Sequence, residues 1–132
     1  MNTKYKDLIN QTFDFPQEEF QTENDNLLFH NINLNELVEQ YGTPLKFTYL
    51  PKISENIKCA KKWFQSAMKK HNYKGKYHYS YCTKSSHFKY VLDEALQNDI
   101  HIETSSAFDI DIVKSLKKEG KLNEEAYVLC NG

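Results

Sequence analysis

Arginine is absent from this 132-residue sequence, and its 17 basic residues outside histidine are all lysines. Guanidinium groups bind phosphates and carboxylates through paired hydrogen bonds, so sites built on that geometry are excluded. The formal net charge of −1 gives no general attraction to nucleic acids or to acidic membranes. We therefore expect neither a nucleic-acid partner nor a membrane partner.

Cysteine is scarce, and no two cysteines form a Cys-x-x-Cys pair. The three are Cys59, Cys82 and Cys130. An odd number at wide spacing favours reduced thiols over a disulfide framework or a zinc site. His78, His87 and His101 also lack the spacing of metal ligands, so we expect no metal. The first residues lack the apolar core of a signal peptide, and no apolar run reaches membrane-spanning length. These features predict a cytoplasmic protein.

Residues 1–33 are predicted to be an amino-terminal leader. Its scattered aromatic residues show no dependable period until a short predicted strand over 27–30. Asn33 then begins a predicted helix over residues 34–41, because Glu36 completes an Asn-x-x-Glu capping pattern.

The next segment predicts one strand and one long helix. Apolar and polar residues alternate from Leu45 to Tyr49, as in a half-buried strand. Apolar residues recur at helical spacing from Ile53 to Met68, with Ser54 as the expected N-cap. Lysines are frequent in this helix, and we favour a solvated face over a basic surface for nucleic acid.

The stretch from Lys76 to Ser86 predicts a strand that stops at Lys84, two hydroxyl residues and then a helix. Alternation along the strand places Cys82 and Lys84 on a small, polar face and Tyr77, Tyr79 and Tyr81 on the other. The tyrosine face suits packing under helices, whereas the polar face suits a cavity. A lysine at the end of a parallel strand is well placed for chemistry, because sites in such folds open at the carboxyl ends of strands.

The rest of the chain alternates helices and strands. We expect a helix capped by Ser85 and Ser86 with Phe88 on its buried face, and strands over 100–104 and 126–130. Ser106 and Asp109 predict a capping box for the helix between those strands. This alternation predicts an α/β fold with a parallel sheet, either doubly wound or part of a barrel. The last strand would leave an uncovered parallel edge, so we expect the front part of a larger protein.

Five segments carry a longer pattern: Tyr41-Gly42-Thr43-Pro44-Leu45 followed by Phe47-Thr48-Tyr49, Ile53-Ser54-Glu55-Asn56-Ile57, Tyr81-Cys82-Thr83-Lys84-Ser85-Ser86, Glu103-Thr104-Ser105-Ser106-Ala107-Phe108-Asp109-Ile110 and Asn131-Gly132. In this order and spacing they resemble the fold type III pyridoxal-phosphate decarboxylases, which act on ornithine, arginine and diaminopimelate. The likeness extends over residues 34–132. The leader and the variant Lys84-Ser85-Ser86-His87-Phe88 look most like an arginine decarboxylase branch, which converts arginine to agmatine in polyamine biosynthesis.

The resemblance implies that residues 34–132 are the amino-terminal part of an alanine racemase-like (β/α)8 barrel and contain its first three strands. In the family a second β domain follows, and a homodimer shares its sites. Lys84 would hold pyridoxal 5′-phosphate as a Schiff base, with Cys82, Glu103 and Asp109 at cofactor-binding positions. The cofactor withdraws electrons from the carbanion left when carbon dioxide departs. A desolvated pocket at the strand end should keep the lysine amine neutral and accessible.

The sequence departs from the family pattern in several places. Ser86 replaces an Asn, and Glu103 replaces a shorter Asp. The family's ring-stacking histidine, glycine-rich phosphate loop, acid for the pyridine nitrogen and second-domain substrate residues have no counterpart. We therefore expect these 132 residues alone to be inactive and poorly folded. An ornithine or diaminopimelate decarboxylase, an alanine racemase type and a non-catalytic partner-binding module remain alternatives.

Overall fold

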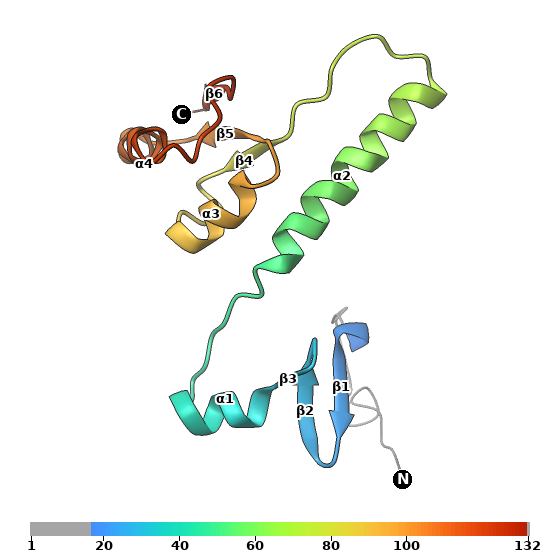
Figure 1. Ribbon diagram of the computed structural model, residues 1–132, viewed down its shortest axis with the longest axis vertical. Coiled ribbons are helices and arrows are strands. Elements are labelled where there is room, and N and C mark those ends of the chain that lie inside the picture. Colours follow the sequence, from blue (N-terminus) through green and yellow to red (C-terminus); the bar gives the residue numbers. More distant parts are fainter. Residues whose placement is uncertain (1–16, 132) are drawn as a thin grey trace. The chain divides into compact units, whose positions relative to one another are not determined.

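The computed structural model describes residues 17–131 (Figure 1). These residues are mixed α/β and contain two three-stranded sheets, neither of which closes into a barrel. The chain divides into two compact units, with the boundary between Phe47 and Thr48. Residues 1–16 of the predicted leader, and Gly132 of the Asn131-Gly132 pair, lie outside the described residues.

The first unit contains a small antiparallel sheet. A short 3-10 turn, η2 (Gln17–Glu19), leads into β1 (Phe20–Glu23), β2 (Asn26–Phe29) and β3 (Ile32–Asn33). Positive backbone φ angles of 48° at Asn24 and 62° at Asp25 form the tight turn between β1 and β2. Asn and Asp tolerate this left-handed conformation better than most residues, which is why they occupy hairpin turns. The predicted strand over 27–30 is confirmed as β2, one residue earlier.

Helix α1 (Leu34–Tyr41) has the predicted bounds. The Asn33 side-chain oxygen accepts hydrogen bonds from the backbone N–H groups of Asn35, at 3.0 Å, and Glu36, at 3.4 Å. The Asn33 amide in turn donates to the Glu36 carboxylate at 2.9 Å. Gly42 ends the helix with a φ of 77°, a conformation that favours glycine.

Two predictions for the middle of the chain are wrong. The structure assigns no strand over residues 45–49. Alternation is a local signal, whereas a strand also requires a neighbour with which to exchange hydrogen bonds. Helix α2 (Pro51–Lys70) begins earlier than predicted, with Leu50 as its N-cap. Proline favours the first helical turn, so Pro51 places the start there, and Ser54 lies inside the helix.

The second unit contains the predicted parallel sheet. Its strands are β4 (Ser80–Cys82), β5 (His101–Thr104) and β6 (Val128–Cys130), arranged in sequence order. Helix α3 (Lys89–Leu96) connects β4 to β5, and helix α4 (Ala107–Lys118) connects β5 to β6 (Figure 1). The predicted order of strands and helices is therefore confirmed for this part of the chain.

One face of this sheet is covered by the connecting helices. Ile102, which is fully buried at the centre of β5, packs with Leu92 of α3 and with Val113 and Leu116 of α4. Tyr81 packs against the same cluster, as predicted for the tyrosine face. A second cluster joins α2 to this layer through three side chains, Ile57, Ala95 and Ile100.

Helix α3 is not capped as predicted. Its N-cap is Phe88, which makes no side-chain capping bond and is 58% exposed. Ser85 belongs instead to the turn after β4, where its N–H donates to the Cys82 carbonyl at 3.1 Å. The Ser86 carbonyl accepts a hydrogen bond from the Tyr81 hydroxyl at 3.0 Å. These contacts keep residues 85–86 in the turn, so the helix begins later.

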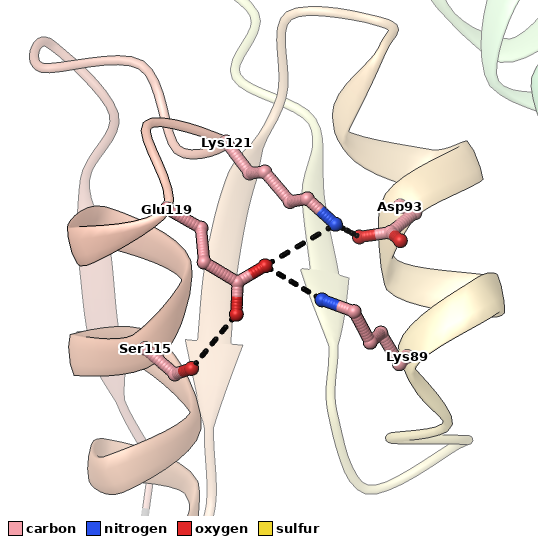
Figure 2. A network of polar contacts seen from close by, with 5 residues as sticks. All are labelled: Lys89, Asp93, Ser115, Glu119 and Lys121. Carbon is pink, nitrogen blue, oxygen red and sulfur yellow. Dashed lines mark hydrogen bonds and ion pairs between the residues drawn. The ribbon is translucent and has the colours of Figure 1, made fainter.

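A polar network joins α3 to the loop after α4 (Figure 2). The Lys121 amine lies 2.6 Å from the Asp93 carboxylate and 3.3 Å from the Glu119 carboxylate. Glu119 also accepts hydrogen bonds from Lys89, at 2.6 Å, and Ser115, at 3.1 Å. The Lys89 bond is the largest of several that lower the pKa of Glu119 to about 2, and the Asp93 bond is the main cause that raises the pKa of Lys121.

Candidate functional site

Lys84 lies in the turn that follows β4, two residues beyond the strand's last residue, Cys82. Its side chain is exposed and makes no hydrogen bond or ion pair with any residue that the structure describes. The neighbouring Thr83 is fully buried, and its N–H donates to the Glu103 carbonyl at 3.0 Å. This bond extends the β4–β5 pairing and fixes the backbone from which Lys84 projects.

Cys82 and Glu103 are brought together by strand pairing. They occupy matching positions of β4 and β5, and Leu129 of β6 is the next residue in the same row. Neighbouring residues in register point to the same face of a sheet, so this row lies opposite the helix-covered face. The Glu103 carboxylate accepts a hydrogen bond from the Asn131 amide at 2.9 Å. The structure thus places two of the predicted site residues side by side, with Asn131 beyond the end of β6.

Asp109 lies apart from that row and serves the start of α4. Its carboxylate accepts hydrogen bonds from the N–H groups of Ser105 and Ser106, both at 3.0 Å, and Ser106 and Asp109 form the predicted capping box. The Ser105 bond is the main reason that the pKa of Asp109 lies below its usual value, with help from Ser106 and the Thr83 hydroxyl and against the effect of burial. The side chain is 7% exposed, and these internal contacts occupy it.

A hollow of about 420 Å³ opens at the carboxyl ends of β5 and β6, beside the start of α4. It is lined by Thr104, Ser105, Ser106, Ala107, Ile110, Cys130 and Asn131. Apolar surface predominates in this lining, and a few hydroxyl and amide groups lie among it, as is usual for small-molecule sites. None of the four predicted site residues is among the lining residues.

No protein-family model, curated protein or solved structure matches this chain. The family resemblance therefore remains a prediction, carried by the five short segments.

The described residues fit one end of pyridoxal 5′-phosphate and not the others. An exposed amine without a partner suits the aldehyde, and Lys84 provides it. The phosphate needs several donors in one place, commonly a glycine-rich loop, but the four glycines of the sequence are scattered singly. The desolvated pocket that we expected around Lys84 is not formed by residues 17–131. We therefore derive no catalytic step through the cofactor.

No group of three or more His, Cys, Asp or Glu side chains in the described part could hold a metal ion. None of the helices there combines the length and the apolar character that a membrane span requires.

Sequence reasoning missed three polar residues at this end of the sheet. Thr83 and Thr104 are buried, and the Thr104 hydroxyl donates to the Leu129 carbonyl at 3.2 Å. Asn131 was part of a family motif, but its contact with Glu103 was not foreseen. The threonines at the ends of β4 and β5 were a visible signal for such contacts, because a buried hydroxyl must find an acceptor.

Proposed function

We propose that this chain carries the lysine-bearing part of a pyridoxal-phosphate-dependent decarboxylase of basic amino acids, with arginine as the favoured substrate. The observation that supports the proposal is the position of Lys84. It follows the first strand of a parallel sheet, and its amine is exposed and has no partner among the described residues. An accessible amine can reach the aldehyde of the cofactor, but it must also be desolvated to stay neutral, and we propose that the remaining barrel supplies that part of the site.

The arrangement around β5 is compatible with a barrel origin for this sheet. The three parallel strands follow one another in sequence order, and both connecting helices pack on the Ile102 face. A (β/α)8 barrel repeats this arrangement around its circumference, and each half of a doubly wound sheet also has it, so the family resemblance is what favours the barrel. In a barrel, the row containing Cys82 and Glu103 would face the interior.

The chemistry divides between the cofactor and the chain. Bound pyridoxal phosphate supplies an electron sink for the carbanion formed on decarboxylation. The part of this chain is to present the Lys84 amine from a fixed turn and to place the Glu103 carboxylate, held by Asn131, at the end of the next strand. We propose that these residues need the remaining barrel and the second domain, in a homodimer, for activity.

Reductive trapping tests this function directly. The 132-residue chain is incubated with pyridoxal phosphate and reduced with borohydride, and modified lysines are identified by peptide mass spectrometry. We expect Lys84 to carry more label than any other lysine, and Lys84→Ala to remove that label. Lys76→Ala is the matched control, because Lys76 is also exposed but precedes β4. Equal labelling of all lysines, both in this chain and in a longer protein that contains it, would refute the cofactor role.

A second measurement tests the claim that this chain is inactive alone. Carbon dioxide release from labelled arginine should not exceed that of the Lys84→Ala variant. Release above that level would show that residues 1–132 suffice for activity.

One observation favours a second candidate, a non-catalytic partner-binding module derived from the same fold. Lys84 is exposed, although a cofactor lysine requires desolvated surroundings. This candidate predicts that Lys84 takes no preferential label, and that no longer protein containing this chain takes it either.

A further inference from the structure

Two histidines and a tyrosine meet at the amino ends of the three parallel strands, opposite the end that carries Lys84. His78 precedes β4, His101 is the first residue of β5, and Tyr127 precedes β6. The ring centroids lie 4.9 Å apart for the two histidines, and 5.4 Å and 4.7 Å from the tyrosine to His78 and His101. We call these three residues the histidine clasp.

Two hydrogen bonds connect the clasp across the sheet. The Tyr127 backbone N–H donates to His101 Nδ1 at 3.1 Å. His101 Nε2 lies 2.8 Å from His78 Nδ1. The Tyr127 carbonyl also accepts from the Ile102 N–H at 3.1 Å, so the His101 ring adds one bond at the start of the β5–β6 pairing. Through this ring, all three strands are joined.

These contacts fix where each proton must lie. His101 Nδ1 accepts a hydrogen bond, so it carries no proton, and a neutral His101 must carry its proton on Nε2. His101 Nε2–H then donates to His78 Nδ1, which must also be unprotonated. Both hydrogen bonds therefore exist together only while the Nδ1 atoms of His78 and His101 are unprotonated.

An added proton breaks this arrangement at either ring. A proton on His101 Nδ1 faces the Tyr127 N–H, and a proton on His78 Nδ1 faces the His101 Nε2–H. Each case sets one donor against another, and two charged rings would repel. We propose that the histidine clasp is an acid-sensitive contact. While both rings are neutral, its hydrogen bonds stabilise the pairing of β5 with the amino end of β6, and protonation breaks them.

The surroundings of the clasp shift the pKa of His101 in both directions. Partial burial is the largest cause that lowers the pKa of His101 below 6.5, and His78 adds to this effect. Asp99 raises the pKa of His101, and Lys61 lowers it. Lys61 also binds the Asn98 and Asp99 carbonyls, at 2.7 and 2.6 Å, so its charge is held in place.

The sign of the pH effect follows from the lowered pKa of His101. The unfolded chain binds this proton more tightly than the folded one, because the unfolded histidine keeps its usual pKa of 6.5. The contribution of the clasp is therefore complete above pH 6.5. It is lost as the pH falls from 6.5 through the lower pKa of the folded state.

Nitrogen-15 NMR of the 132-residue chain tests the proposal without any mutation. At pH 8 the rings of His78 and His101 should both show the Nε2–H tautomer. The protection of the Tyr127 amide from hydrogen exchange, corrected for intrinsic rates, should fall roughly fivefold between pH 8 and pH 5, the effect of one lost hydrogen bond. The Leu92 amide, bonded to the Phe88 carbonyl inside α3, reports global unfolding and should change less.

A matched pair of variants separates the clasp from general acid sensitivity. In His78→Asn, the side-chain carbonyl can accept from His101 Nε2–H whether or not His101 is charged, so the titration midpoint of His101 should rise. His71→Asn, at the exposed end of α2, should leave that midpoint unchanged. An Nδ1–H tautomer at His101, a wild-type midpoint at or above 6.5, or equal Tyr127 protection at both pH values would overturn the proposal.

Discussion

The two faces of the β4–β5–β6 sheet are built from alternate residues of the same strands, yet they differ in surroundings. Ile102 faces the helices and is fully buried, whereas Glu103, the next residue, lies on the opposite face and is half-buried. On that face Leu129 is 45% exposed. Packing fixes the first face, while the second retains side chains that a ligand or further protein could contact. The buried apolar contacts thus lie on one side of these three short strands, and the proposed site residues Cys82 and Glu103 lie on the other.

The largest expected effect comes from truncating one apolar residue on each face. Ile102→Ala should lower the free energy of unfolding by about 2–5 kcal/mol, because it leaves a cavity between β5 and both helices. Leu129→Ala, the matched control, should cost less than about 1 kcal/mol, since nearly half of that residue is already exposed to solvent. Urea denaturation followed by circular dichroism measures both. Equal losses would mean that the two faces are equally packed.

The Ile102 face could be predicted from the sequence because its signals are local. The strand predicted over 100–104 is confirmed as β5, Tyr81 was predicted on the face under the helices, and the capping pattern of Ser106 located the start of α4. Each of these signals lies within a few residues of the feature that it predicts. The predicted strand over 45–49 was wrong because strand pairing depends on a distant partner.

The surroundings of the candidate site could not be predicted in the same way. The sequence predicted a strand that stops at Lys84, but β4 ends at Cys82 and leaves Lys84 in the turn, where its exposure depends on which elements cover that turn. The contact between Glu103 and Asn131 and the pairing of His78 with His101 each join residues more than 20 positions apart. No periodicity encodes such a contact, because it arises only when strand register is set.

A smaller effect is expected where the helix layer meets the candidate site. Asp109→Asn keeps the size of the side chain but weakens its bonds to the Ser105 and Ser106 N–H groups at the start of α4. The urea midpoint should fall by less than in Ile102→Ala. Asp111→Asn, on the exposed side of the same helix, is the matched control and should change it little.

The pH dependence of the Asp109 variant has a definite sign. The folded-state pKa of Asp109 lies below the usual 3.8, so its stabilising contribution is present above pH 3.8 and is lost as the pH falls through the folded-state value. Asp109→Asn should therefore lose less stability than the unmodified chain between pH 5 and pH 3. An identical loss in both would show that these hydrogen bonds do not hold the carboxylate in its charged form.

The smallest effect is expected for the exposed network that joins α3 to the end of α4 (Figure 2). Glu119→Gln removes the charge that faces Lys89 and Lys121, whereas Glu103→Gln removes a carboxylate from the opposite face of the sheet. The pKa of Glu119 is about 2, against a usual 4.5, so its contribution to stability is complete above pH 4.5 and is lost as the pH falls towards 2.

Salt screens exposed charges, so the difference in stability between Glu119→Gln and the unmodified chain should shrink from low to high ionic strength. Chemical denaturation at pH 7 in low and high salt measures it. If Glu103→Gln proved the more costly of the two, the uncovered face would contribute to the stability that we assign to the helix-covered one.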